Sequence, residues 1–524
     1  MQSKTSLGGR RSRLPGRVIA AITAAIAMVA GVTVAIVLPA NAAPPAAKTI
    51  VSLTFDDGHA SQQVAFETMK QYGMLGTFYM NSGFVGATGF LGLDEVKAIA
   101  AYGNEIGTHT ITHPDLATLT SDEAKRQICN DRVNWANWGL PVTNFAYPFA
   151  SSTTAVEALV KDCGDNSGRG LGDIRTVTNA ASASYPLAET IPPADPYLTK
   201  APDQVEAAWT LENLKTQVTQ AEAAGGWVQL TFHDICDGCA DPNVSPVVFQ
   251  QFVAWLAPRA SRGTVVERVQ DVIGGTVAPA VAGPVAPEAA AGVNAIKNPS
   301  LETLDTATGL PQGFSAVAYG TNTPSWVTTA DAHTGTSAVT MTMTGYVDGA
   351  ARLMPTLDLG EYSPTVTPGQ SYTLGAWYKS DVPTQFDLYY RTALGTWAYW
   401  TSSEWFAASS TYAEATYNTP TVPAGATAVS FGLNLFQNGT LTVDDLSMVS
   451  GTAAAPALRA TSLTLNSSTV IGGDAPLTAE EPKAKGDVIT EHYEIPAPVA
   501  SPVAPSIENP GPNTFVLTPE KMRG

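Results

Sequence analysis

The chain has 524 residues, which suggests two or three domains, and its 44% hydrophobic content with ten tryptophans is enough for well-packed cores. Only 14% of the residues are charged, and the formal net charge is −18. Outside the N-terminus there is no basic patch, so this acidic balance excludes nucleic acid as a partner.

The N-terminal residues 1–42 have the pattern of a secretory signal peptide. Five basic residues precede an apolar stretch over residues 18–39, and the Ala-Asn-Ala sequence at 40–42 offers a cleavage site. A retained membrane anchor is the alternative, because the apolar stretch is long enough to span a bilayer. The cleavage site favours removal, and we therefore expect a secreted protein with no stable membrane anchor.

The four cysteines fit an exported protein with up to two disulfides, for which three pairings are possible. The alternative is a structural zinc site, which would need four thiolates brought together in an oxidising compartment, and it is disfavoured. The pairing that we favour is Cys129–Cys163 with Cys236–Cys239.

Residues 48–274 alternate between short β-branched or aromatic runs and segments of helical periodicity. Such repeated strand–helix units predict an α/β fold, with a parallel sheet closed into a distorted (β/α) barrel and helices outside it. Catalytic residues of such barrels gather on loops after the C-terminal ends of the strands. A Thr120–Glu123 capping box marks the start of one helix. The strand-like runs cover residues 50–55, 76–81, 105–110, 142–148, 174–179 and 227–233, and the helical segments cover 60–73, 93–103, 121–139, 153–163, 210–225 and 245–260.

The rest of the chain divides into three segments of different composition. Residues 275–292 are rich in alanine and proline and predict an extended linker. From residue 293 to 450, short alternating strands separated by turn residues predict an all-β sandwich resembling a jelly roll. Residues 451–524 are rich in alanine and proline and sparsely apolar, which predicts a low-complexity, mostly disordered tail.

Two adjacent carboxylates, Asp56 and Asp57, stand where a predicted buried strand meets its loop. Neighbours in a strand point to opposite faces, but a turn at Gly58 allows both to enter one pocket. Taken alone, Asp-Asp-Gly is more readily explained as an ordinary turn. Burying two like charges is costly, and a metal ion would offset that cost.

Three of the six histidines also fall at the ends of predicted strands, which favours one site over the alternative of scattered loop histidines. We predict that Asp57, His109 and His113 hold a divalent ion with open positions for water and substrate. Such an ion activates bound water and polarises a carbonyl. Asp56, beside the ion, would act as general base, and His233 would protonate the leaving group as general acid.

The sequences TFDDG, HTITH and LTFHD, in this order, resemble the signature blocks of polysaccharide deacetylases, the NodB-homology or carbohydrate esterase 4 family. The resemblance implies a NodB-type barrel that removes acetyl groups from chitin, peptidoglycan, xylan or related glycans with one divalent ion. Zinc is our first expectation, with cobalt or manganese as alternatives, and chitin-type N-acetylglucosamine is our first expectation for the substrate. The implied roles agree with those above: Asp57, His109 and His113 as ligands, Asp56 as base and His233 as acid.

The sequence FAYPFA, residues 145–150, is similar to a fourth block of the family but departs from it. The commoner pattern has an arginine at Ala146 that orients the catalytic aspartate, and Arg175 or Arg169 is a candidate substitute. Surface salt bridges are an equally good explanation of those two arginines. Phe149 stands where the family often has tyrosine, and its backbone N–H would stabilise the oxyanion. The candidate substrate contacts in this block are Tyr147 and Pro148.

Other residues near these blocks have two interpretations each. Asp234 either orients His233 or caps the following turn, which we favour, and His59 is either a secondary contact or, as we favour, an ordinary loop residue. The loop 179–209 is long enough to shape a substrate cleft. Its aromatic residues either stack on sugar rings or anchor the loop: Tyr185, Tyr197 and Trp209.

The predicted sandwich has a cluster of aromatic residues in a segment of low charge. Its opening and closing sequences, IKNPSLET and LTVDDLSMV, loosely resemble appended carbohydrate-binding modules. Rigid aromatic side chains suit the apolar faces of sugars, but each residue is as readily part of the core. Alternation predicts that at least one is a core residue. The candidates for glycan binding are Trp397, Tyr399, Trp400 and Trp405.

Two rival hypotheses remain beside a secreted, metal-dependent polysaccharide deacetylase. One is a glycan-binding protein whose barrel has lost catalysis, which the alanine at position 146 motivates. The other is a metallohydrolase acting on a different acyl or imidic bond, because one fold serves many substrates.

Overall fold

The computed structural model describes residues 49–450. The predicted signal peptide and the predicted tail lie outside the described residues. Within residues 49–450, no helix has the length and apolar character needed to cross a membrane.

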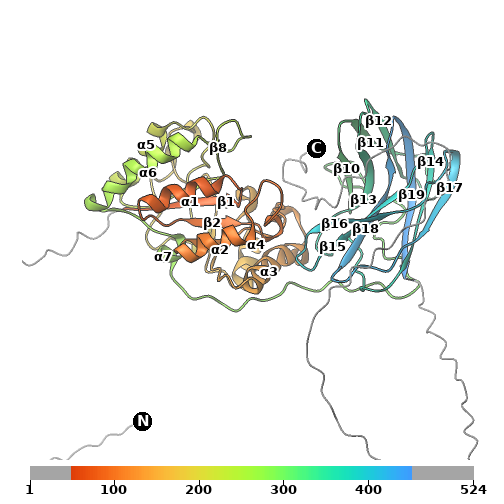
Figure 1. Cartoon of the computed structure of the whole chain (residues 1–524), viewed down its shortest axis with the longest axis horizontal. Helices are drawn as coiled ribbons and strands as arrows, with labels where there is room; N and C mark the ends of the chain where they lie inside the picture. The colour runs from red at the N-terminus through yellow and green to blue at the C-terminus, as the bar shows by residue number, and fades with distance from the viewer. Residues whose placement is uncertain (1–48, 451–524) are drawn as a thin grey trace, which may run out of the picture. The chain divides into compact units, whose positions relative to one another are not determined.

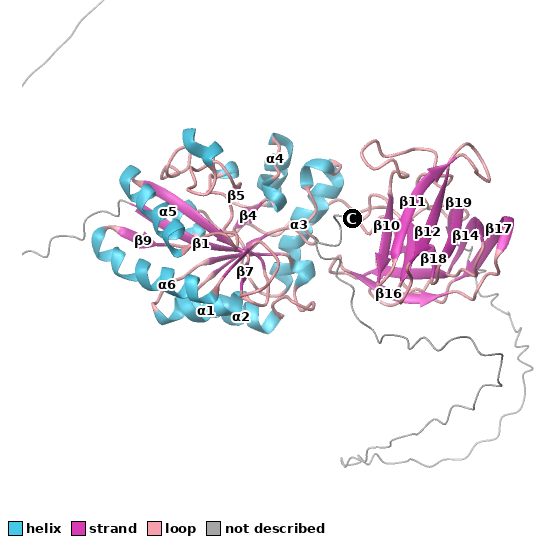
Figure 2. Cartoon of the chain, turned by 90° about the horizontal axis from the view of Figure 1, so that it is seen from above, coloured by secondary structure: helices cyan, strands magenta, loops and turns pink. Residues whose placement is uncertain are grey.

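A curled parallel sheet forms the centre of the first part of the chain (Figure 2). Its order is β5-β4-β3-β2-β1-β6, and β9 also pairs with β1. Strand β1 pairs with β6 along one edge, while its other edge pairs first with β9 and then with β2, so the sheet divides there. The strands are β1 (Thr49–Asp57), β2 (Thr77–Met80), β3 (Glu105–Thr108), β4 (Asn144–Ala146), β5 (Ser167–Arg169), β6 (Gly226–Phe232) and β9 (Thr264–Val266).

The long loop after β5 bridges the gap between β5 and β6. Thr199 pairs with Arg169 of β5, and Glu189 pairs with Trp227 of β6. These bridges close the curled sheet, and the predicted fold class, a distorted (β/α) barrel, is confirmed. The barrel is distorted because loop backbone, and not a regular strand, completes the circle.

One predicted strand is wrong. Residues 174–179 are rich in β-branched side chains, but they belong to the irregular loop, and the strand after helix α4 (Thr154–Cys163) is β5 instead. The Ser-Gly-Arg sequence of β5 has no β-branched or aromatic residue that would indicate a strand. Gly168 is required there because a Cβ atom would lie 2.5 Å from the Tyr147 hydroxyl. Packing across the sheet therefore overrides local propensity.

Helices surround the barrel strands in Figures 1 and 2. Their apolar sides enclose a core of the β1, β2 and β6 side chains, in which the rings of Phe55, Phe78 and Phe232 are fully buried. Thr120 caps α3 by accepting a hydrogen bond from the Glu123 backbone N–H. The helices are α1 (Gln62–Gln71), α2 (Leu93–Tyr102), α3 (Ser121–Asn137), α4 (Thr154–Cys163), α5 (Leu211–Ala224), α6 (Pro246–Leu256) and α7 (Val269–Ile273).

Two disulfides are formed in this part of the chain. Cys129 and Cys163 join α3 to α4. Cys236 and Cys239 close a short turn between the two-residue strands β7 (Asp234–Ile235) and β8 (Asn243–Val244). This is the pairing that we favoured from the sequence.

Residues 275–292 contain no helix or strand, and a β-sandwich follows them (Figure 1). Its two five-stranded antiparallel sheets have the orders β10-β13-β18-β15-β16 and β11-β12-β19-β14-β17. Apolar side chains of both sheets form one core. The strands are β10 (Phe314–Tyr319), β11 (Thr323–Thr329), β12 (Ala338–Thr344), β13 (Ala350–Pro355), β14 (Tyr372–Ser380), β15 (Phe386–Arg391), β16 (Trp397–Ser402), β17 (Ser409–Asn418), β18 (Ala428–Leu435) and β19 (Gly439–Ser450).

Candidate active site and metal centre

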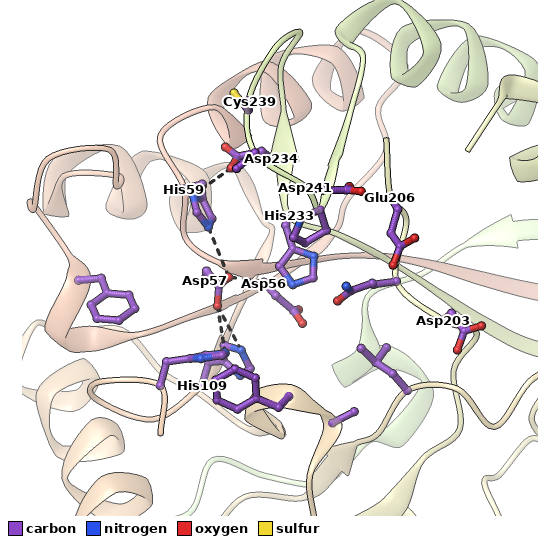
Figure 3. A pocket seen from close by; sticks show the side chains of 18 of the residues that line it. Asp56, Asp57, His59, His109, Asp203, Glu206, His233, Asp234, Cys239 and Asp241 are labelled. Carbon is purple, nitrogen blue, oxygen red and sulfur yellow. Dashed lines mark hydrogen bonds and ion pairs between the residues drawn. The ribbon is translucent and has the colours of Figure 1, made fainter. Parts of the chain in front are cut away.

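The end of β1 directs both aspartates into one cavity. Asp57 has a φ of 72° and Gly58 a φ of 80°, so the chain turns through the left-handed region as the strand ends. Asp56 and Asp57 therefore both line the cavity, although they are neighbours in sequence (Figure 3). Asp57 adopts this unfavourable conformation at a candidate functional site, where such strain is often found.

Asp57, His109 and His113 converge as a candidate metal centre. Oδ1 of Asp57 lies 3.4 Å from Nε2 of His109 and 3.4 Å from Nε2 of His113. One ligand atom from each of the three residues lies within 4.8 Å of the other two. Oδ1 of Asp57 is buried without a hydrogen-bond partner, which fits a cation as its missing partner. Two imidazoles and a carboxylate suit zinc and related divalent ions.

Backbone contacts orient the two histidines. Nδ1 of His109 lies 2.7 Å from the carbonyl oxygen of Ala146, so an Nδ1–H donor leaves the Nε2 lone pair facing Asp57. Thr110 Oγ1 accepts a hydrogen bond from the backbone N–H of His113, whose φ of 59° turns the loop back toward the cavity. The two rings meet edge to face, with centroids 4.7 Å apart. Both ligand atoms therefore face the same point.

The electrostatics of Asp57 and His113 favour a cation. Burial raises the pKa of Asp57, but His113, His109, His59 and His233 outweigh it and hold that pKa well below its usual range. Burial lowers the pKa of His113 to about 4, so this imidazole is neutral near pH 7 and its nitrogen is available as a ligand. Carboxylate and imidazole side chains bind a metal ion when the carboxylate is ionised and the imidazole is neutral.

Arg169 supplies the guanidinium that position 146 lacks. Its Nη2 donates to Oδ2 of Asp56 over 2.5 Å, and its Nη1 donates to Thr231 Oγ1 over 2.6 Å. Both side chains of the Arg169–Asp56 pair are almost completely buried. Arg169 stands beside Ala146 in the β4–β5 register, so the charge comes from the adjacent strand. Of the two arginines that the sequence offered as substitutes for the missing family arginine, Arg169 is the one that contacts Asp56.

His233 follows the last residue of β6 and also lines the cavity (Figure 3). Its Nε2 is 4.0 Å from Oδ2 of Asp57, and burial lowers the pKa of its imidazole. Gln62, which the sequence analysis did not single out, donates from Nε2 to the backbone carbonyls of Asp56 and His233. This buried amide links the end of β1 to the end of β6, and no motif in the sequence indicated it.

The part of the chain that carries the candidate ligands matches a known protein family. Residues 43–166 match the family model "Polysaccharide deacetylase", and the match includes the three candidate ligands and Asp56. The chain contains a polysaccharide deacetylase domain. The matched residues end before Arg169 and His233, so this family match does not cover those two side chains.

Curated relatives are similar over a limited stretch. The chain is 31% identical over 100 residues to a putative polysaccharide deacetylase of Bacillus subtilis, which is 19% of this chain and 36% of that protein. It is 36% identical over 86 residues to a peptidoglycan-N-acetylglucosamine deacetylase of Bacillus cereus, which is 16% of this chain and 30% of that protein. The chain therefore spans about a third of the length of these relatives.

One solved structure similar to this chain is a family 4 acetyl xylan esterase from Clostridium thermocellum. The two are 17% identical, with a TM-score of 0.30, over 43% of this chain and 89% of that chain.

The FAYPFA residues of the deacetylase domain differ in how they lie relative to the cavity. Phe149 lines the cavity with its backbone at a φ of 56°, and its exposed ring packs against His113, with centroids 4.7 Å apart. Tyr147 also lines the cavity, but it is buried and its hydroxyl donates to the carbonyl of Tyr197 over 2.6 Å. Pro148 is buried and is not among the residues that line the cavity, so its predicted substrate contact stays a prediction that the cavity wall does not support.

The cavity of the deacetylase domain has a volume of about 1170 Å³. The long loop contributes Asn179, Asp203, Glu206 and Trp209 to its wall, so this loop does shape the cleft. Trp209 is buried, which leaves it part of the core as well. The other two aromatic residues of the loop are not in the wall: Tyr185 is exposed elsewhere, and Tyr197 anchors the loop through its backbone carbonyl.

In the sandwich, the four candidate aromatics differ in exposure. Trp397 is 6% exposed and belongs to a buried cluster, so it is a core residue. Tyr399 and Trp405 are 40% and 54% exposed. The β15–β16 register shifts between Tyr389↔Tyr399 and Leu388↔Thr401, which leaves Trp400 as a bulge residue packed against the core. Tyr399 and Trp405 are therefore the two that remain available for a ligand.

Proposed function

We propose that the deacetylase domain is a divalent-metal-dependent hydrolase that removes acetyl groups from a polysaccharide. One observation carries the proposal: the Asp57, His109 and His113 cluster lies in the same cavity as Asp56 and His233. A metal site alone would serve many functions, but a base and an acid on either side of it are what acyl hydrolysis requires.

Each residue has a role that follows from its position. Asp56, held by the buried guanidinium of Arg169, accepts the proton of the attacking water. His233 carries a proton to the departing nitrogen or oxygen. The backbone N–H of Phe149, at the cavity wall beside His113, stabilises the oxyanion. A divalent ion bound by the three ligands would supply a Lewis acid for the acetyl carbonyl and the attacking water.

The ion that we propose is zinc. The donor set contains two nitrogens and one oxygen, and imidazole ligands favour zinc over magnesium or calcium. Cobalt and manganese accept the same donors, so activity with either would agree with the proposal.

We propose a neutral glycan, with N-acetylglucosamine units of the chitin type, as the substrate. Six carboxylate side chains line the cavity, and none of the described residues that line it is lysine or arginine. Two of the six act at the centre, and the negative charge of the other four disfavours anionic sugars in the cavity. Peptidoglycan contains carboxylate groups, which the acidic cavity would repel, and it is therefore a less suitable substrate than a neutral glycan. These other four carboxylates belong to Asp203, Glu206, Asp234 and Asp241.

The exposed aromatics of the sandwich support a second role, polysaccharide binding, for residues 293–450. The two disulfides support the proposal that the protein acts outside the cytoplasm, where such bonds persist. The buried Arg169–Asp56 pair weighs against a barrel that has lost catalysis, because the base is still oriented.

Acetate release tests the proposal. Purified protein with Zn²⁺ would be incubated with N-acetylated chitooligosaccharides, acetylated xylan and peptidoglycan. We expect release to be fastest from the chitooligosaccharides, to stop with a chelator and to return with added Zn²⁺. Asp56→Asn should lower kcat by ~10²–10⁴-fold, while Asp94→Asn, a matched change of an exposed aspartate in α2, should have no effect. No acetate from any substrate would contradict the proposed function.

A further inference from the structure

His59 lies between two carboxylates at the edge of the candidate metal centre (Figure 3). Its Nε2 is 3.4 Å from Oδ2 of Asp57, and its Nδ1 is 3.3 Å from Oδ2 of Asp234. The sequence favoured an ordinary loop histidine at this position and a turn cap for Asp234. The structure instead joins the two residues in one chain of contacts that ends on a candidate metal ligand.

The ring of His59 is fixed by its surroundings. It stacks on the ring of Phe90, with centroids 5.1 Å apart, and the two backbones form an isolated β-bridge. Asp234 is fixed as well, because Ser61 Oγ donates to its Oδ1 over 2.5 Å. Ser61 Oγ in turn accepts from the backbone N–H of Ile235 over 3.0 Å. Both partners of the contact are therefore held in place before any ligand binds.

The contacts of Asp57 divide between its two oxygens. Oδ1 faces the two candidate ligand histidines, His109 and His113. Oδ2 faces His59 at 3.4 Å and His233 at 4.0 Å. A contact on Oδ2 determines the rotation of the carboxylate about its Cβ–Cγ bond, and thereby the direction of Oδ1.

We infer that His59, oriented by Asp234, is a positioning residue that holds the carboxylate of Asp57 so that Oδ1 faces the metal ion. The inference rests on the proposed function in one respect, that Asp57 is a metal ligand. Neither residue touches the substrate in this role. Asp234 acts one step further out, through the imidazole, and its contribution should be smaller than that of His59.

Partners outside the ligand set typically contribute 10–100-fold to metal affinity. We therefore expect loss of the His59 contact to weaken Zn²⁺ binding by ~10–100-fold. His59→Phe removes both ring nitrogens but keeps an aromatic ring on Phe90. His59→Gln keeps an N–H donor at the position of Nε2, and it should recover most of the lost affinity.

Isothermal titration of the metal-free full chain with Zn²⁺ alone tests the inference. The variants are His59→Phe, His59→Gln and Asp234→Asn. The matched control is His333→Gln, because His333 in the sandwich also contacts a carboxylate, Asp445, and stacks on a ring. Circular dichroism and thermal melting establish that each variant is folded. The expected order of affinity is wild type and control, then His59→Gln and Asp234→Asn, then His59→Phe.

Two results would overturn the inference: Zn²⁺ affinity of a folded His59→Phe variant equal to wild type, or an equal loss in His59→Gln and His59→Phe. Acetate release by the wild type is measured in parallel. If the affinities follow the expected order but no acetate appears, the proposed function fails and the positioning role of His59 stands.

Discussion

Replacing Arg169 should disturb the orientation of the base Asp56 without weakening the binding of the metal ion. Its guanidinium bridges Asp56 and Thr231, at 2.5 and 2.6 Å, in a buried site. Arg169→Met keeps much of the side-chain length and leaves the Asp56 carboxylate buried without its counter-ion. The substitution does not alter Asp57, His109 or His113. We therefore expect kcat to fall while Zn²⁺ affinity stays near that of the wild type.

Two magnitudes follow from the burial of this pair. Removing one partner of a buried ion pair costs about 3–5 kcal/mol of unfolding free energy. At roughly 2–4 °C per kcal/mol for a domain of this size, the melting temperature should fall by roughly 6–20 °C. General-base catalysis contributes ~10²–10⁴-fold. Because Asp56 remains present but is no longer held, we expect kcat to fall by ~10²-fold, or about 2.7 kcal/mol of activation free energy.

The assay is acetate release at a temperature well below the melting point of each variant, with Zn²⁺ titration on the same samples. Arg169→Lys should be intermediate, because one ammonium does not reproduce the two-pronged contact. Arg175→Met is the control, since within residues 49–450 no hydrogen bond or ion pair joins Arg175 to Asp56. A folded Arg169→Met variant with the kcat of the wild type would refute the argument that this guanidinium orients the base.

Three further results are expected. Loss of Cys129–Cys163, which closes a loop of 34 residues, should cost about 3–4 kcal/mol of unfolding free energy, whereas loss of Cys236–Cys239, which closes a loop of three, should cost about 1–2 kcal/mol. Chemical denaturation of the serine variants measures both losses, and the reverse order would contradict chain entropy as the cause. Phe149→Gly keeps the backbone N–H, and glycine tolerates the φ of 56°. We therefore expect kcat/KM to fall by less than the ~10²–10³-fold that is typical of a lost oxyanion donor. A larger fall would show that the ring of Phe149, and not its backbone N–H, contributes most to catalysis. Trp405→Ala should reduce retention on insoluble chitin without changing acetate release from soluble oligomers, and equal retention would remove Trp405 from the binding surface.

The sequence alone determined the fold class and predicted the main members of the candidate site. The alternation of strand-like and helical segments indicated the barrel because side-chain periodicity depends only on local geometry. The order of the three motifs placed Asp57, His109 and His113 at strand ends, and strand ends of a parallel barrel meet at one edge. The sequence carries no physical reason for one cysteine pairing over another, and the structure supplies the contact between α3 and α4 that explains one of the pairs.

Only the tertiary structure decided how these residues are held. Arg169 reaches Asp56 across 113 positions of sequence, from a three-residue strand that has no local signal. His59 contacts Asp234, and Gln62 reaches the carbonyl of His233, only because the end of β1 lies beside the end of β6. The exposure of Trp405 and the burial of Trp397 depend likewise on which sheet face is covered. Periodicity is a property of neighbours along the chain, whereas a buried ion pair depends on the packing of strands that are distant in sequence.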